Sequence, residues 1–478
     1  MTPRAGRATL AWWQREAIYQ IYPRSFNDSD GDGIGDLRGI EQRLDHIAAI
    51  AGAIWMSPIF PSPMADFGYD VADYCDVDPV FGTLADFDRL VESAHARDLK
   101  VVLDWVPSHT SEQHEWFEES RSSRESPKRD WYVWRDEPNE WMSAFPAVGR
   151  AWSFDERTGQ WYLHSFTPQQ PDLNWDNPEV EAAMHDVLRF WLDRGVDGFR
   201  LDAIVKLGKG PALNEDAPVI HDRLRAIRRV VDAYPERMLV GEVYLFNTAR
   251  LAAYVEPDQL HMAHNFIVAQ LPWDADAFRT AIETAPGDWP PWFVGNHDMP
   301  RPASRLGPRQ ARAALLLLYA LRGTPFIYQG EELGLPDATI PPERIVDVDG
   351  RDPERAPIPW RPGPGRGFTT GEPWLPFPKH PDALTQERDG DSPLALTRAL
   401  AKLRRETPAL QGGEQRLLDA APGVLAFTRG EDILVVVNFR GEPAPMPAGG
   451  ERMLSSVAGR RAGALAPYEA AVLKLARG

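Results

Sequence analysis

The chain has 478 residues, of which 43% are apolar and 26% are charged. This balance is typical of a folded protein with a sizeable core and argues against a disordered chain. With 52 Lys and Arg against 70 Asp and Glu, the formal net charge is −18, which argues against nucleic acid or an anionic membrane as a partner. The one cysteine, Cys75, excludes an intramolecular disulfide framework.

The sequence predicts a cytoplasmic protein without a membrane anchor. Residues 1–16 are mixed and polar and lack the continuous apolar region of a signal peptide. The most apolar run, 311–320, is far too short to span a bilayer. A single cysteine also fits a reducing compartment.

Eight short apolar runs, each suited to a buried parallel strand, alternate with amphipathic stretches. This alternation predicts an α/β protein built on a closed (β/α)8 TIM barrel rather than an open sheet. The predicted strands are 17–22, 53–56, 101–105, 198–201, 238–243, 261–267, 292–294 and 325–328. The helical patterns between them include 84–97, 180–194, 221–233 and 310–321.

Two stretches interrupt this alternation. After the third strand, the segment 110–177 is rich in Trp, Pro and charge and is too long for a βα loop, so it predicts a small inserted domain. Towards the end of the chain, alternating segments at 423–428 and 432–439 predict a β-sandwich. The predicted domains are a catalytic barrel at 1–109 and 178–411, an inserted domain B at 110–177 and a C-terminal β-sandwich at 412–478.

Polar side chains follow four of the predicted strands, at the end where a barrel of this kind carries its active site. A single carboxylate after a strand is more often the cap of the next helix. Four such strand ends around one barrel mouth instead favour a functional site. They are the segments 104–109, 198–203, 240–242 and 293–298.

Converging carboxylates suit glycoside hydrolysis, in which one attacks or supports the anomeric carbon and a second, protonated one donates to the leaving oxygen. Arg200, two residues before Asp202, is expected to keep the pKa of Asp202 low. Glu242 follows apolar residues, where burial can raise its pKa into the working range of an acid. The sequence has no zinc-ligand cluster and no nucleotide-binding glycine loop.

The four strand ends resemble the four signature regions of the α-amylase superfamily of retaining glycosidases (glycoside hydrolase family 13), and the resemblance covers nearly the whole chain. The stretches 17–26, 170–175 and 323–332 are similar to the oligo-1,6-glucosidase/α-glucosidase branch. The resemblance implies Asp202 as the nucleophile, Glu242 as the acid/base and Asp298 as the carboxylate that orients the sugar and stabilises the oxocarbenium-like state.

The same resemblance implies a −1 subsite for glucose, in which Tyr69 is expected to stack on the sugar. One position departs from the superfamily, which usually has Asn before the histidine of its first region. Ser108 takes that place here, and this puts the hydrogen-bond support of the loop in question. The implied substrate-binding residues are Asp66, Tyr69, His109, Arg200, His297 and Arg355.

The stretch 28–36 has aspartates at a spacing of two with a glycine at the turn, a pattern that places hard oxygen ligands around one cation. It follows the first positions of an EF-hand loop but has Gly39 where the bidentate Glu belongs. A solvated acidic turn is the alternative. Because similar loops in the resembled branch hold calcium, the stretch predicts a structural Ca²⁺ site. The predicted ligands are Asp28, Asp30, Asp32, Asp36 and the carbonyl of Ile34.

These observations predict a retaining, exo-acting α-glucosidase that releases glucose from the non-reducing ends of short, small-molecule α-glucosides. In the resembled branch, Val after the nucleophile goes with α-1,6 activity and Ala or Thr with α-1,4 activity, so Ala203 favours the α-1,4 linkage. The alternatives are an α-1,6-glucosidase, or a glucosyltransferase or isomerase of the trehalose or isomaltulose synthase type, which share the glucosyl-enzyme intermediate. A non-catalytic transporter-ancillary subunit is disfavoured because the three carboxylates are complete and a transmembrane segment is lacking.

Overall fold

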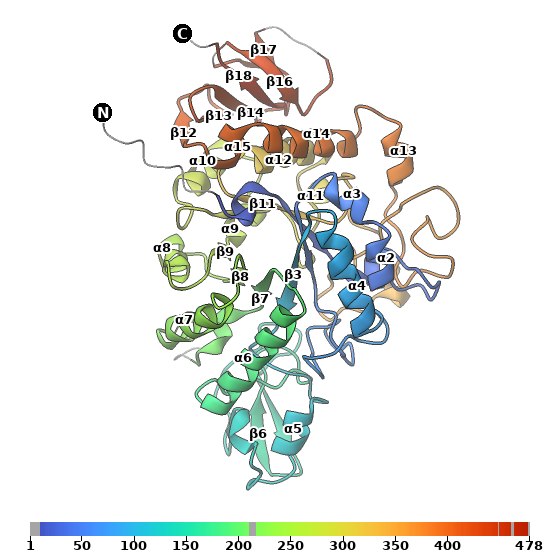
Figure 1. The fold of residues 1–478 in the computed structure, drawn as a ribbon, viewed down its shortest axis with the longest axis vertical. Coiled ribbons are helices and arrows are strands. Elements are labelled where there is room, and N and C mark those ends of the chain that lie inside the picture. The colour runs from blue at the N-terminus through green and yellow to red at the C-terminus, as the bar shows by residue number, and fades with distance from the viewer. Residues whose placement is uncertain (1–9, 210–216, 448, 460–462, 477–478) are drawn as a thin grey trace.

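The computed structural model describes residues 10–209, 217–447, 449–459 and 463–476. The first nine residues of the predicted barrel and the last two of the predicted sandwich lie outside this part of the chain. The centre of the molecule is an eight-stranded parallel sheet that curls into a barrel, with helices around it (Figure 1). The predicted (β/α)8 architecture is confirmed.

All eight predicted barrel strands are present in the sheet. Their hydrogen-bonded order is β10-β11-β1-β2-β3-β7-β8-β9. Apolar side chains from alternate positions, among them Trp55, Val102 and Phe326, fill the barrel interior. The strands are β1 (Ile18–Ile21), β2 (Ala53–Met56), β3 (Lys100–Trp105), β7 (Gly198–Leu201), β8 (Met238–Glu242), β9 (Met262–His264), β10 (Pro291–Trp292) and β11 (Thr324–Tyr328).

The barrel has a seam between β9 and β10. These two strands lie next to each other, but they are the two ends of the hydrogen-bonded order given above. β9 is also shorter than the predicted strand 261–267. It ends early because the side chain of Asn265 accepts from the amide of Ile267 and starts a helix there.

The helical patterns predicted between the strands correspond to helices that cover the barrel. α4 begins at a capping box in which Thr83 and Asp86 exchange hydrogen bonds, and α6 begins at Asn177 with Pro178 at its first position. In the described part of the chain, none of the helices is long and apolar enough to cross a membrane. The helices of the barrel region are α1 (Trp12–Arg15), α2 (Leu37–Glu41), α3 (Leu44–Ala48), α4 (Leu84–His95), α6 (Pro178–Asp193), α7 (Val219–Val231), α8 (Thr248–Ala252), α9 (Phe266–Gln270), α10 (Ala275–Glu283), α11 (Pro302–Arg305) and α12 (Pro308–Ala320).

The segment that follows β3 forms a lobe on one side of the barrel, drawn in teal in Figure 1. Aromatic side chains build its core. Phe117 and Trp134, for example, stack with their ring planes 2° apart and their centroids 5.7 Å apart. The lobe contains α5 (Glu115–Ser120) and a three-stranded antiparallel sheet of β4 (Trp134–Arg135), β5 (Trp152–Asp155) and β6 (Gln160–Leu163).

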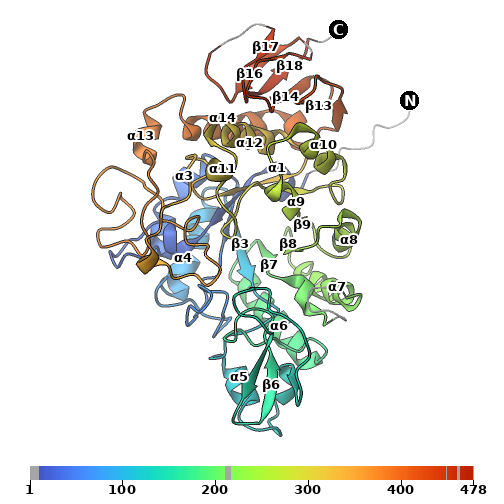
Figure 2. The same ribbon diagram turned by 180° about the vertical axis from the view of Figure 1, so that it is seen from behind.

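The C-terminal strands pack against α12 and α14 at the end of the molecule away from this lobe (Figure 2). Alternate residues of β14 face opposite sides: Val435 joins the main core, whereas Val436 joins a second core under a two-stranded sheet. Two apolar faces make this unit a sandwich, as predicted. Its strands are β12 (Gln415–Leu418), β13 (Val424–Arg429), β14 (Ile433–Asn438), β15 (Ala444–Pro445), β16 (Glu451–Ser455), β17 (Ala464–Leu465) and β18 (Ala470–Lys474). The helices that precede it are α13 (Ala383–Glu387), α14 (Pro393–Glu406) and α15 (Pro408–Gly412).

Candidate active site

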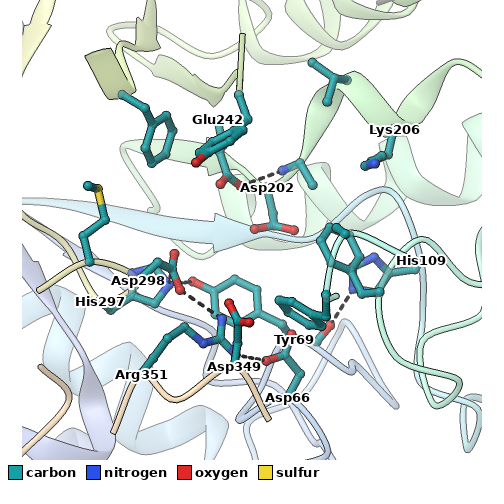
Figure 3. A pocket seen from close by; sticks show the side chains of 18 residues that line it. Asp66, Tyr69, His109, Asp202, Lys206, Glu242, His297, Asp298, Asp349 and Arg351 are labelled. Atoms are coloured by element: carbon teal, nitrogen blue, oxygen red, sulfur yellow. Dashed lines mark hydrogen bonds and ion pairs between the residues drawn. The ribbon is translucent and has the colours of Figure 1, made fainter. Parts of the chain in front are cut away.

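A cavity of about 520 Å³ lies at the C-terminal ends of the barrel strands. Loops from the barrel, the inserted lobe and the long segment after β11 all contribute to its wall (Figure 3). Each of the three carboxylates predicted to be catalytic lines it. The lining residues are Asp66, Tyr69, His109, Ala144, Phe145, Phe166, Asp202, Ala203, Val205, Lys206, Glu242, Tyr244, Phe266, His297, Asp298, Met299, Asp349 and Arg351.

Arg200, on β7, holds three carboxylates together at the base of the cavity. Its Nη1 donates to Asp202 and, at 2.8 Å, to Asp104, while its Nη2 lies 2.8 Å from Oε2 of Glu242. The parallel register brings them together, because Asp104 on β3 pairs with Arg200 and Arg200 pairs with Val240 on β8. One guanidinium among three carboxylates leaves an excess of negative charge in a site that water barely reaches.

This environment separates the pKa values of the catalytic candidates. Burial raises the pKa of Glu242 to about 7 and that of Asp202 to about 6, although Arg200 lowers both. The prediction that Arg200 keeps the pKa of Asp202 low is therefore wrong, because desolvation outweighs the nearby positive charge. For Asp298 burial also acts upwards, but the interactions with His297, Arg351 and Arg355 outweigh it and hold the pKa well below its usual range.

The contacts of Glu242 determine which of its oxygens can carry a proton. Oε2 accepts from Arg200 and, at 3.0 Å, from the amide of Ala203, so a proton on the carboxyl group has to be on Oε1. Ala203 adopts φ of +43°, in the left-handed region, which costs about 1–3 kcal/mol for a residue with a side chain. This strained turn aims the amide at the predicted acid.

His297 is held as a neutral ring. Its Nδ1 lies 2.7 Å from the amide nitrogen of Gln20, which can only donate, so the ring proton is on Nε2. Nε2 lies 2.6 Å from the hydroxyl of Tyr69 and 3.2 Å from Oδ2 of Asp298. Burial lowers the pKa of His297 to about 3. Tyr69 lines the cavity and stacks on His297, with the ring planes 3° apart and the centroids 5.5 Å apart.

Ser108 supports His109 directly, which answers the question raised by its departure from the superfamily. The Nε2 of His109 lies 2.9 Å from the carbonyl of Tyr69, which can only accept, so Nε2 carries the proton. Nδ1 then accepts from the hydroxyl of Ser108 at 2.8 Å. The carbonyl of Tyr69 thus sets the ring tautomer, and the serine bonds the other ring nitrogen from the position where an asparagine was expected.

Arg351 is a residue of the cavity that sequence reasoning missed. It lies 2.7 Å from Asp66 and 3.0 Å from Asp298, on the side of the cavity opposite Glu242 in Figure 3. Arg355 does not line the cavity. It reaches Oδ1 of Asp298 at 2.9 Å and the carbonyl of His297 at 2.8 Å from behind. The spacing of four between the two arginines could have indicated Arg351, because one turn of chain can direct both side chains towards Asp298.

Other residues of the site were also missed, among them Lys206 and Asp349, which line the cavity. Asp104 is fully buried beneath Arg200, and its position at the end of β3 was visible in the sequence. The aromatic residues Tyr244 and Phe266 line the cavity from the loop after β8 and from the start of α9, and their residue types gave no signal.

The acidic stretch 28–36 folds into a compact loop. Carboxylate oxygens of Asp28, Asp30 and Asp36 lie within 4.8 Å of one another, whereas Asp32 is not part of this group. Both oxygens of Asp28 accept from loop amides, and burial together with the neighbouring Asp30 raises the pKa of Asp36. A hard-oxygen donor set under mutual repulsion fits a calcium ion.

The barrel, the carboxylates at the C-terminal ends of its strands and the separation of their pKa values are typical of one class of protein. It is an enzyme that cleaves glycosidic bonds by carboxylate chemistry. The family described as "Alpha amylase, catalytic domain" matches residues 20–413. The chain therefore belongs to the α-amylase family of glycoside hydrolases, whose α-glucosidase branch is retaining.

Similar proteins cover nearly the whole chain. A probable α-glucosidase of Rhizobium meliloti is 42% identical over 91% of this chain and 90% of its own length. An oligo-1,6-glucosidase of Parageobacillus thermoglucosidasius is 35% identical, with 90% of each chain covered. Among solved structures, an α-glucosyl transfer enzyme is 41% identical with a TM-score of 0.89, covering 97% of this chain and 100% of its own. The trehalulose synthase of Pseudomonas mesoacidophila is 34% identical with a TM-score of 0.92, covering 98% and 100%.

Proposed function

We propose that this protein is an exo-acting α-glucosidase that releases glucose, with retention, from the non-reducing ends of short α-glucosides. The observation that carries the proposal is that Asp202, Glu242 and Asp298 line one cavity, with Arg200 bound to the first two. Their pKa values are separated, that of Glu242 being highest and that of Asp298 lowest. Such a separation supplies a proton donor and a charged stabiliser in the same site at neutral pH.

In the first step, a carboxylate oxygen of Asp202 attacks the anomeric carbon and forms a covalent ester. The bond to the leaving oxygen breaks, and that oxygen takes the proton from Oε1 of Glu242. Asp298, held ionised by Arg351 and Arg355, stabilises the positive charge that develops on the sugar ring. In the second step, water attacks the anomeric carbon, gives its proton to Glu242 and releases Asp202.

Exo-action is supported by the far side of the cavity. The ion pair between Arg351 and Asp66 stands opposite Glu242, where a sugar beyond the first glucose would have to pass (Figure 3). Arg351 is further held by Asp347 at 2.7 Å and lies 5.2 Å from the ring of Phe145 in the inserted lobe. The leaving group therefore has to depart on the side of Glu242.

The nucleophile assignment is tested by Asp202→Asn. Because the amide cannot form the glucosyl ester, we expect kcat/KM for p-nitrophenyl α-glucoside to fall by at least about 10⁴-fold. Glu118→Gln, on the exposed face of the inserted lobe, is the matched control and should retain full activity. Circular dichroism and the thermal midpoint show whether the variant is folded. Substantial turnover by folded Asp202→Asn would refute the assignment.

A preference for α-1,4 linkages is supported by Ala203, the small residue beside Asp202. Ala203→Val places a branched side chain at the cavity wall and should lower the ratio of maltose to isomaltose hydrolysis. Relatives named for α-1,6 activity are similar to the chain, and so is a relative named a probable α-glucosidase. The ratio in the unaltered protein is therefore the first measurement. A ratio below one would favour the α-1,6 alternative.

The loop at 28–36 is proposed to hold a structural calcium ion through Asp28, Asp30 and Asp36. It lies outside the cavity, and none of its residues lines it. A reducing, cytoplasmic compartment is also proposed, on the basis of the single, half-buried Cys75, whose thiol pKa is raised to about 11 by burial.

A further inference from the structure

The inserted lobe carries a groove of its own, with a volume of about 500 Å³. Residues of β4, of the segments on either side of β4 and of the segment 174–176 line it, together with Lys209 from the barrel. It shares none of its lining residues with the catalytic cavity. We call it the lobe groove. Its lining includes Asp130, Arg135, Trp141, Asn174, Asp176 and Lys209.

The charges of the lobe groove cancel. Asp130 and Asp176 bring two negative charges, and Arg135 and Lys209 bring two positive ones. A phosphate group would therefore meet two carboxylates in the groove, and a cationic ligand would meet two positive side chains. An apolar ligand would remove these four charged groups from water without replacing their hydrogen bonds. The groove thus favours a neutral ligand that is rich in polar groups.

The two carboxylates keep hydrogen-bond acceptors that the described part of the chain does not use. Oδ1 of Asp130 accepts from the side-chain amide of Asn174 at 3.2 Å, and Oδ1 of Asp176 accepts from Arg223. Within the described residues, Oδ2 of each carboxylate has no protein donor. Both side chains are exposed, so these oxygens can accept from the hydroxyl groups of a ligand.

The two cationic groups keep unused donors in the same way. Nζ of Lys209 donates to Asp172 at 2.6 Å and to the carbonyl of Lys206 at 2.7 Å, which uses two of its three protons. The guanidinium of Arg135 lies 5.2 Å from the ring centroids of both Trp141 and Trp152, and no described residue accepts a hydrogen bond from it. The groove therefore offers donors as well as acceptors.

Trp141 adds an aromatic ring to this polar surface. The ring is half-buried and packs on that of Trp152, with the centroids 6.1 Å and the planes 20° apart. This contact and the guanidinium of Arg135 hold it in a defined orientation. An aromatic ring packs against the C–H face of a sugar, while carboxylates and cationic groups bind the hydroxyls at its edge. One ring among balanced donors and acceptors is a combination that matches a sugar.

We infer that the lobe groove is a second, non-catalytic binding site for a neutral saccharide. The inference goes beyond the proposed function, because none of the catalytic carboxylates takes part in it. The groove and the cavity are joined by one short segment: Lys209 lines the groove, and the carbonyl to which it donates belongs to Lys206, whose side chain lines the cavity.

The test is equilibrium dialysis of radiolabelled maltotriose against Asp202→Asn, in which the saccharide stays intact. Adding Trp141→Ala should remove one bound saccharide per chain, since loss of a packed ring lowers affinity about tenfold or more. Trp141→Phe, which keeps a ring, should retain it. Asp130→Ala, which removes only hydrogen-bond acceptors on an exposed side chain, should weaken the same binding about five- to tenfold.

Phe154→Ala is the matched control. Phe154 is an aromatic residue of the same lobe, is 51% exposed and does not line the groove, so its substitution should leave binding unchanged. The number of saccharides bound by folded Trp141→Ala decides the question, and the affinity of Asp130→Ala decides it if that variant does not fold. An unchanged value would overturn the inference and leave the α-glucosidase function intact. Failure of the unaltered protein to hydrolyse maltose would overturn the proposed function but not the dialysis result.

Discussion

The two sides of the cavity are held in place by different kinds of contact. The inner side is that of His297 and Arg351, and the outer side is that of Glu242 and Tyr244. On the inner side, His297 is fixed by Gln20 and Tyr69, and Arg351 is fixed by three carboxylates. On the outer side, Tyr244 has one hydrogen bond and two ring contacts. A network of directional bonds admits one sugar in one orientation, whereas ring contacts admit many shapes. Under the proposed function, this difference predicts that selectivity for glucose and tolerance of its leaving group can be altered separately.

The most severe disruption of the inner side is Arg351→Ala. It removes the ion-pair partner of Asp66 and one of the two guanidinium groups that Asp298 and Asp347 contact, the other being that of Arg355. We expect kcat/KM for maltose to fall by about 10²-fold, the scale of losing one preorganised electrostatic contact in an active site.

Arg361→Ala is the control for this experiment, because Arg361 is an exposed residue of the same long segment. It should leave kcat/KM unchanged. Product chromatography on longer maltooligosaccharides then tests the closure of the cavity: the Arg351 variant should release some maltose beside glucose. Undiminished glucose release by folded Arg351→Ala would show that the inner side does not depend on this ion pair.

A second prediction concerns the pH dependence of the inner side. Asp202 has to be ionised and Glu242 protonated, and their pKa values are about 6 and about 7. The value of kcat/KM should therefore rise with pH through about 6 and fall through about 7, which gives a narrow bell with about a tenfold loss per unit outside it. Because the two groups interact, the limbs report values of the pair.

The alkaline limb of this profile is assigned by Glu242→Gln. With α-glucosyl fluoride, whose leaving group needs no proton, this variant should still form the glucosyl ester and should lose the fall in rate above about pH 7 in a single-turnover measurement. An alkaline limb that persists in Glu242→Gln would belong to another group.

The smallest expected effect is removal of the proposed calcium ion, which lies outside both sides of the cavity. The loop contacts the long segment that carries Arg351: the amide of Asp28 donates to the carbonyl of Phe368 at 2.9 Å, and the amide of Trp374 donates to that of Gly33 at 3.1 Å. EDTA should lower the thermal midpoint by roughly 2–5 °C, with little change in initial rate at 25 °C. Asp30→Asn should reduce this response, and an EDTA-insensitive midpoint in the unaltered protein would argue against a bound ion.

The barrel was predictable because its signals are local. A buried parallel strand is an apolar run that ends in a polar residue, and β2 and β7 were predicted to the residue. β9 was predicted too long, because the capping role of Asn265 is weak evidence beside an apolar run that continues to Ile267. Signals of this kind describe where a strand begins more reliably than where it gives way to a helix.

The site was predictable to the extent that its residues follow strands. Asp202 follows β7, Glu242 is the last residue of β8 and Asp298 follows β10, and the fold brings them to one cavity. The pKa of Asp202 was misjudged, because burial depends on the whole site while the neighbouring Arg200 is visible in the sequence. Tyr244 and Phe266 were missed for a related reason. The sequence does not distinguish an aromatic residue of the core from one that lines a cavity, because the distinction depends on the fold.

The seam between β9 and β10 allows the cavity rim to change shape locally. The lining residue Phe266 follows β9 and the lining residue Met299 follows β10. They therefore lie on either side of the one place where the described barrel strands are not joined by ladder hydrogen bonds. Backbone shifts at the seam break no hydrogen bond between these two strands. An insertion or a bulkier side chain at this point of the rim can change the width of the entrance while β7 and β8, and the carboxylates they carry, stay in register. We therefore expect that the width of the cavity entrance can evolve at the seam with the smallest loss in the free energy of unfolding.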